Sequence, residues 1–93
     1  MGHGFLIHRR DDHVGVATSD LEAGATVVGV YMDDDGTTEV PANYPVPLGH
    51  KIAVEAVAEG EPVIEYGVPI GRATAPIARG DYVHTHNLKS ARW

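Results

Sequence analysis

Two histidines near the C-terminal end of the chain, His84 and His86, are separated by one residue and followed directly by Asn87. On a β-strand, residues two apart project from the same face, about 6–7 Å apart along the chain. Two imidazoles on one face can relay protons, contact one carboxylate or take neighbouring positions on one metal ion. The spacing therefore makes His84 and His86 the candidate catalytic pair, either as metal ligands or as a proton relay.

A second group of suitable side chains, His50 and Lys51, follows a proline-rich segment. The segment "PANYPVPLGH" predicts a surface loop that leads to these two residues. Together with the amide of Asn87, an imidazole and an ammonium group suit the binding of an anionic substrate. Adjacent residues on an ideal strand face opposite sides. His50 and Lys51 would therefore share a face only if the turn at Gly49 twists them.

Three turns with one shared pattern organise the chain. Segments that begin at Asp20, Ala56 and Pro76 all follow the pattern x-(Leu/Val/Ile)-x-x-Gly-x-x-Val. An apolar residue anchors each turn to the core, and a glycine supplies a positive φ before a strand begins at the valine. The predicted turn glycines are Gly24, Gly60 and Gly80. The Arg-Gly-Asp sequence around Gly80 is therefore interpreted as a turn and not as an adhesion signal.

The acidic segment from Asp33 to Gly36 invites comparison with a calcium-binding loop. An EF-hand loop needs a glutamate six residues after its glycine, and Ala42 occupies that position here. The flanking segments "VVGVYM" and "TTEV" are instead typical of paired strands. The sequence predicts a hairpin whose turn contains Asp35 and Gly36.

Bulk composition limits the fold and the class of function. The 93 residues carry a formal net charge of −6, with no cysteine. A disulfide scaffold and a thiol nucleophile are excluded, and nucleic acid and anionic membrane surfaces are disfavoured as partners. Short alternating segments rich in Val, Ile and Tyr predict a mainly β protein of short strands, with Ala53–Ala58 the one place for a helix. We expect one cytoplasmic domain over residues 1–93, without a signal peptide.

Longer motifs resemble a known family. The segments "GHKIAV" and "EGEPVIEYGVPIGRATAPIARGDYVHTHN" are similar to the N-terminal SAF domain of the altronate dehydratase family. That resemblance implies a small β-clip (SAF-like) domain. The segments "FLIHRRDDHVGVAT", "GVYMDDDGT" and "HNLKSARW" extend the resemblance to the whole chain, and they are most similar to the small subunits of sulfo-lyases within this family.

The resemblance also implies a chemistry. The family eliminates a β-leaving group from a 2-hydroxy acid, and the resulting enol becomes a 2-oxo acid. The leaving group is hydroxide in the sugar-acid dehydratases and sulfite, released from sulfolactate, in the sulfo-lyases. The resemblance implies a divalent metal, iron, held mainly by a large catalytic subunit. We expect His50, Lys51, His84 and His86 to border the active site of that partner.

Two alternatives remain open from the sequence. One is a small subunit or domain of an altronate-type dehydratase, and the other is a non-catalytic β-clip module that binds a carboxylate or a partner protein. The C-terminal residues Lys89, Arg92 and Trp93 are suited to docking on a partner. His3, His8 and His13 have no partner at ligand spacing and receive no role.

Overall fold

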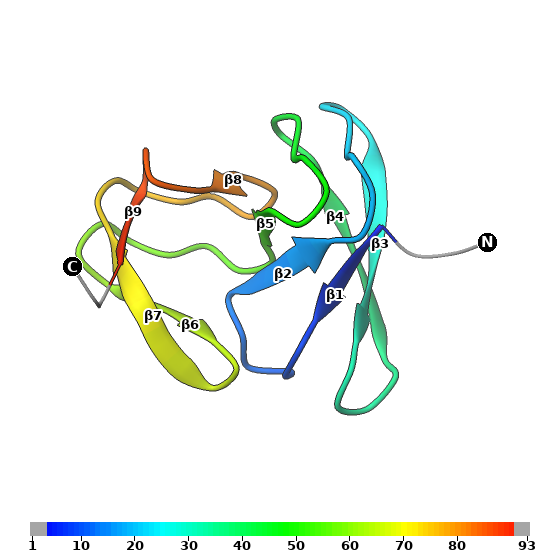
Figure 1. Ribbon diagram of the computed structural model, residues 1–93, viewed down its shortest axis with the longest axis horizontal. Coiled ribbons are helices and arrows are strands. Elements are labelled where there is room, and N and C mark those ends of the chain that lie inside the picture. The colour runs from blue at the N-terminus through cyan, green and yellow to red at the C-terminus, as the bar shows by residue number, and fades with distance from the viewer. Residues whose placement is uncertain (1–3, 91–93) are drawn as a thin grey trace.

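The computed structural model describes residues 4–90, and these form nine short strands without an α-helix (Figure 1). The strands are β1 (Phe5–Ile7), β2 (Val14–Ala17), β3 (Thr26–Tyr31), β4 (Thr37–Pro41), β5 (Lys51–Ala53), β6 (Pro62–Glu65), β7 (Val68–Ala73), β8 (Tyr82–Val83) and β9 (Leu88–Ser90). The mainly β prediction is confirmed. The helix allowed for Ala53–Ala58 is wrong, because β5 is followed by a bend at Val54 and Glu55. Residues 4–90 contain no helix that is long and apolar enough to span a membrane.

The strands form two sheets that lie side by side in Figure 1. The larger sheet has the order β4-β3-β1-β2-β5-β8, and the smaller has the order β6-β7-β9. In the larger sheet β1 and β3 pair in parallel, and every other pair in both sheets is antiparallel. The predicted β-clip class is consistent with this curled mixed sheet and its small companion.

Apolar side chains gather in two clusters, and β5 contributes to both. Ile52 of β5 and Val54, directly after the strand, lie in the larger cluster, whereas Ala53 between them lies in the smaller one. The larger cluster contains Phe5, Ile7, Ala17, Leu21, Val27, Tyr31, Val40, Ala42, Val46, Ile52 and Val54. The smaller cluster contains Val14, Ala53, Val57, Val63, Ala73, Ile77 and Val83. The two-residue alternation of an extended chain thus lets one strand serve two cores.

The three repeated turns have the predicted backbone. The φ angles of Gly24, Gly60 and Gly80 are 88°, 87° and 95°, in the left-handed region. Asp81 closes the third turn by accepting a hydrogen bond from the amide of Ala78 at 2.9 Å. The Arg-Gly-Asp sequence is therefore part of a turn, as the repeat predicted.

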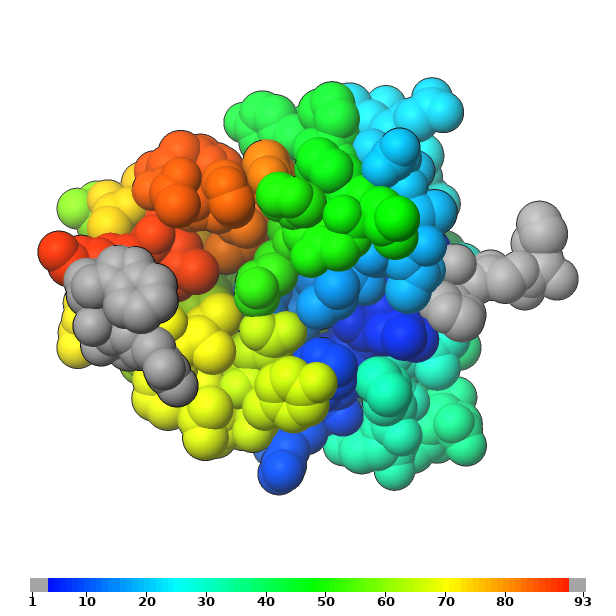
Figure 2. Space-filling view, viewed as in Figure 1, coloured from blue at the N-terminus to red at the C-terminus, as the bar shows by residue number. Residues whose placement is uncertain are grey.

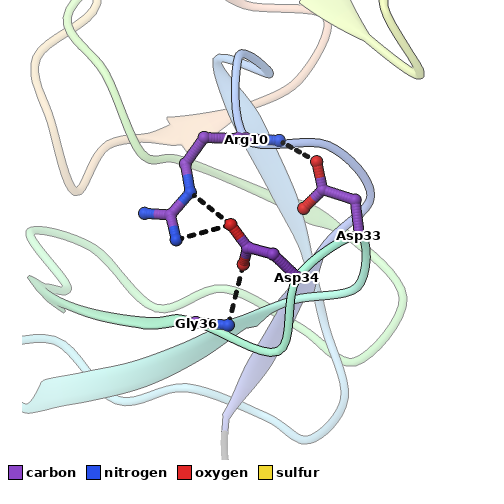
Figure 3. A network of polar contacts seen from close by, with 4 residues as sticks. All are labelled: Arg10, Asp33, Asp34 and Gly36. Carbon is purple, nitrogen blue, oxygen red and sulfur yellow. Dashed lines mark hydrogen bonds and ion pairs between the residues drawn. The ribbon is translucent and has the colours of Figure 1, made fainter.

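The acidic segment forms the predicted hairpin between β3 and β4, with Asp35 at a φ of 61°. Figure 3 shows the hydrogen bonds of the Asp34 carboxylate. It accepts one from the amide of Gly36 at 2.8 Å and two from the guanidinium of Arg10, at 2.8 and 3.1 Å. The Gly36 amide first, and Arg10 second, lower the pKa of the Asp34 carboxyl from its ordinary value. The turn's acidic groups therefore fix the hairpin beside the loop after β1.

A buried carboxylate joins the two sheets. Asp12 has no exposed surface, and its two oxygens accept hydrogen bonds from the amides of Tyr66 at 2.9 Å and Gly67 at 3.0 Å. Both of these turn residues have positive φ, at 58° and 74°, as a two-residue hairpin turn between β6 and β7 requires. The adjacent His13 accepts a hydrogen bond through Nδ1 from the amide of Ile64 at 2.9 Å. The loop between β1 and β2 thus holds the β6–β7 hairpin.

The repeated turns offer a matched pair of substitutions. A Cβ on Gly80 would collide with the backbone carbonyl of Pro41, whereas a Cβ on Gly24 would meet nothing within 4 Å. We expect Gly24→Ala to lower the free energy of unfolding by about 1 kcal/mol through φ strain alone. Gly80→Ala should cost about 3 kcal/mol, because overpacking adds to the same strain. Urea unfolding of both variants measures the difference, and equal losses would contradict the collision.

Candidate functional site

Four aromatic rings meet where β5 and β8 lie side by side, and we call His50, Tyr82, His84 and His86 the ring cluster. The ring centroids of His50 and His84 are 5.2 Å apart. Tyr82 stacks on His84 at 5.4 Å with an interplanar angle of 6°, and it lies 5.7 Å from the ring of His86. The hydroxyl of Tyr82 and Nδ1 of His50 are hydrogen-bonded at 2.7 Å. The structure therefore brings the three predicted histidines together around a tyrosine.

Strand register explains why these rings meet. In the antiparallel pair of β5 and β8, Ile52 lies opposite Tyr82 and Lys51 lies opposite Val83. Extending that register by one residue places His50 opposite His84, and directly opposed side chains share a face. Tyr82 has the same two-residue spacing from His84 that drew attention to His86. That spacing could have identified the tyrosine from sequence.

The segment after β8 differs from its predicted form. His84 and His86 were expected on one strand, but β8 ends at Val83, and residues 85–87 form a turn. The amides of Asn87 and Leu88 both donate to the carbonyl of His84, at 3.0 and 2.9 Å. The strand prediction is therefore wrong, although both imidazoles lie on the exposed turn and contact Tyr82.

Asn87 is the residue that closes this turn. Its side chain is buried, its Oδ1 accepts from the amide of His84 at 2.9 Å, and its Nδ2 donates to the carbonyl of Tyr82 at 2.9 Å. A buried amide whose oxygen and nitrogen both have backbone partners is well suited to hold a loop in one conformation. Asn87 thus fixes the backbone that carries both histidines.

The side chain of Lys51 leaves the strand pair on the face opposite to that of His50. Its register position opposite Val83 is one residue away from that of His50, so the two side chains leave opposite faces of the strand pair. Lys51 and His84 nevertheless both line a cavity of about 340 Å³ beside the end of β8. His50 therefore contacts the ring of His84 on one face, and Lys51 lines a cavity with His84 on the other.

A buried carboxylate that the sequence analysis missed lies next to Lys51. Glu65 is 6% exposed, and its Oε1 is 3.9 Å from the Nζ of Lys51. Its other oxygen is 3.7 Å from Nε2 of His8, whose ring stacks on Tyr66 with centroids 3.7 Å apart. The sequence analysis gave His8 no role, because its contacts with Glu65 and Tyr66 join segments more than 50 residues apart and no local pattern signals them.

The loop before β5 and the turn after β8 adjoin each other on the face shown in Figure 2, in green and orange. The donors on this face do not by themselves make a metal site. Across residues 4–90, no group of three or more His, Asp or Glu side chains is arranged to hold a metal ion. Catalytic metal sites usually have about three protein ligands. His84 and His86 would therefore need ligands from another chain to hold one.

The chain is similar to a known protein family and to several of its members. The model of the altronate/galactarate dehydratase SAF domain matches residues 3–91. The chain is 43% identical over 90 residues to the (2R)-sulfolactate sulfo-lyase subunit alpha of Chromohalobacter salexigens, with 96% of each chain covered. It is 38% identical over 64 residues to the subunit of that name from Paracoccus pantotrophus, covering 69% of this chain and 96% of the relative.

The chain also matches a much longer enzyme. It is 46% identical over 79 residues to the altronate dehydratase of Escherichia coli K12, which covers 85% of this chain and 15% of the dehydratase. The residues that carried the sequence resemblance, from "GHKIAV" to "VHTHN", lie within the range that the family model matches. This chain therefore belongs to the altronate/galactarate dehydratase SAF domain family.

Proposed function

We propose that the chain is the small subunit of a (2R)-3-sulfolactate sulfo-lyase, and that its ring cluster borders an active site shared with a large subunit. One observation carries this proposal. The chain matches a subunit alpha of that enzyme over 96% of both lengths, whereas it covers 15% of the altronate dehydratase of Escherichia coli. The partner follows from the relative's name, since a subunit alpha works beside another subunit.

The proposed reaction is a β-elimination. A base removes the proton from C2 of sulfolactate, next to the carboxylate, and the C2–H electron pair forms the C2=C3 double bond. The C3–S bond breaks, and its electron pair leaves with sulfite. The enol that remains loses its hydroxyl proton as it takes up a proton at C3, and it becomes pyruvate. Such a reaction needs a proton carrier and positive charge around the substrate's anionic groups.

The proton-carrying role is assigned to His84 and His86. Both imidazoles are exposed on the turn, so a substrate held by the partner subunit can reach them. Stacking on Tyr82 limits the orientations of His84, and Asn87 fixes the turn backbone. Because both polar atoms of Asn87 are used within the turn, we assign it to positioning the histidines and not to direct substrate contact.

Substrate binding is assigned to His50 and Lys51. When the Tyr82 hydroxyl donates to Nδ1 of His50, the imidazole keeps its hydrogen on Nε2, which can donate to a substrate oxygen. The ammonium of Lys51 supplies positive charge from the neighbouring cavity. A divalent metal, iron by family resemblance, would be held mainly by the large subunit. Ligation of that metal by His84 or His86 would be the alternative to their proton-carrying role. When bound, the metal would polarise the carboxylate and hydroxyl oxygens of the substrate.

An altronate-type dehydratase subunit is the second candidate. It is supported by 46% identity to altronate dehydratase over 85% of this chain. The same histidines would then serve the elimination of hydroxide from a sugar acid. Assays of the assembled enzyme with sulfolactate and with altronate separate the two, since only the sulfo-lyase releases sulfite.

Replacing both exposed histidines tests the catalytic assignment. In the complex with the large subunit, His84→Asn together with His86→Asn should lower kcat for sulfite and pyruvate release by at least about 100-fold, as expected for lost proton transfer. His8→Asn, which removes an imidazole outside the ring cluster, should keep kcat within about twofold of wild type. Wild-type activity in the double variant would contradict the assignment. Full activity of the large subunit alone would contradict the shared site.

Removing a single hydroxyl tests the role of His50. Tyr82→Phe should raise KM for sulfolactate about fivefold with little change in kcat, because one hydrogen bond of about 1 kcal/mol no longer fixes the His50 tautomer. Tyr31→Phe is the matched control, since it removes a hydroxyl from a buried tyrosine outside the ring cluster. Steady-state kinetics of both variants provide the measurement. A fall in kcat with KM unchanged would show that the hydroxyl acts in proton transfer instead.

A further inference from the structure

Both lysines of the chain line one cavity. Lys51 and Lys89 are the two lysines in the sequence, and each borders the cavity of about 340 Å³ that also includes His84. The hydroxyl side chains of Thr74 and Thr85 lie on the same lining. Small-molecule sites usually have volumes of about 300–1,000 Å³. The cavity is therefore large enough for a small ligand, and side chains that can donate hydrogen bonds are among its lining residues.

The cavity lies between the two sheets. Lys51 begins β5 in the larger sheet, whereas Lys89 lies in β9 of the smaller sheet, where it pairs with Arg72 of β7. The turn that carries His84 and His86 connects β8 to β9. A ligand in this cavity would consequently touch both sheets and lie next to one member of the ring cluster.

The charge around the cavity favours an anion. None of its lining residues is an aspartate or glutamate, although the whole chain has a net charge of −6. Lys89 forms no ion pair with an acidic side chain in residues 4–90. Glu65 forms an ion pair with Lys51 at 3.9 Å, which offsets part of the Lys51 charge but is longer than a hydrogen bond. Two lysines thus line one small volume in an otherwise acidic protein, and Lys89 is the one without an acidic partner in residues 4–90.

We propose that this cavity binds the sulfonate group of the substrate, which deepens the proposed function and rests on it. Each lysine is a compact charge with three rotatable donors, which suits a tetrahedral group with three oxygens. A planar carboxylate is better matched by the fork of an arginine, and no arginine lines the cavity. A sulfonate between Lys51 and Lys89 lies beside His84 and carries its C–S bond to the ring cluster. Lys89 is then the residue that distinguishes a sulfonate substrate from a sugar acid.

The presence of only two lysines makes a direct test practical. Reductive methylation of the full chain with ¹³C-formaldehyde gives one dimethylamine signal for each lysine and one for the N-terminal amine. It preserves the positive charge and one N–H donor on each lysine. The lysine signals are assigned with Lys51→Arg and Lys89→Arg. The labelled chain is titrated with 3-sulfolactate, with malate, which has a carboxylate in place of the sulfonate, and with lactate, which lacks the second anionic group.

We expect both lysine signals to shift and saturate with sulfolactate, with an affinity at least about tenfold higher than for malate or lactate. Lys89→Gln should weaken sulfolactate binding about tenfold through the loss of one charge-assisted contact. Arg72→Gln is the charge-matched control, because Arg72 is the cross-strand neighbour of Lys89 but binds the carbonyl of Gly60 outside the cavity. It should change the affinity by less than about twofold.

Unshifted lysine signals, equal affinities for sulfolactate and lactate, or equal losses in Lys89→Gln and Arg72→Gln would each overturn the sulfonate site. Preferential binding of malate would also overturn it and would assign the cavity to a carboxylate. Failure of the proposed function looks different. In that case the chain binds sulfolactate through both lysines, yet the complex with the large subunit releases no sulfite.

Discussion

The arrangement of the two sheets depends on the hydrogen bonds that the Asp12 carboxylate accepts from the tip of the β6–β7 hairpin. A fully buried charge is stable only when hydrogen bonds replace the water it has lost. Here the backbone amides of Tyr66 and Gly67 provide them, more than 50 residues away in the sequence. Because these amides belong to the tip of the β6–β7 hairpin, satisfying the carboxylate also places that hairpin. The same turn carries Tyr66 to its stack on His8.

The candidate site depends on that placement. Lys51 and the ring cluster belong to the larger sheet or its extension, whereas Glu65 and Lys89 belong to the smaller sheet. Their spacing is therefore set by how the sheets are joined. Within the larger sheet, the pairing of β5 with β8 is enough to bring His50 beside His84. The pairing of these two strands thus positions the histidines, whereas the joining of the two sheets positions the two lysines.

Local patterns in the sequence were sufficient for the turns, and they drew attention to the three histidines that lie together in the ring cluster. Gly24, Gly60 and Gly80 each adopt positive φ, because a repeated local pattern encodes a local backbone geometry. The strand predicted through His84 was wrong because the Asn87 side chain caps the preceding backbone and closes a turn. A local capping hydrogen bond competes with strand geometry in this way.

Contacts between distant segments left no comparable pattern. Glu65 meets His8 and Lys51 only after the sheets assemble, and the role of Asp12 requires the hairpin to be in place. Tyr82 is a different case, because its two-residue spacing from His84 was visible in the sequence. Pairing rules therefore recover neighbours within a strand, whereas contacts across the fold require the tertiary structure.

The sharing of β5 between two cores has a consequence for how the domain opens. Ile52 and Val54 are buried on one side and Ala53 on the other, so neither apolar cluster can separate from this strand without exposing the other. Regions that are buried on both sides exchange their amide hydrogens mainly through global unfolding. Hydrogen exchange of the β5 amides should therefore report the unfolding of the entire molecule. The pairing of β5 with β8, which brings His50 beside His84, then persists for as long as the chain is folded.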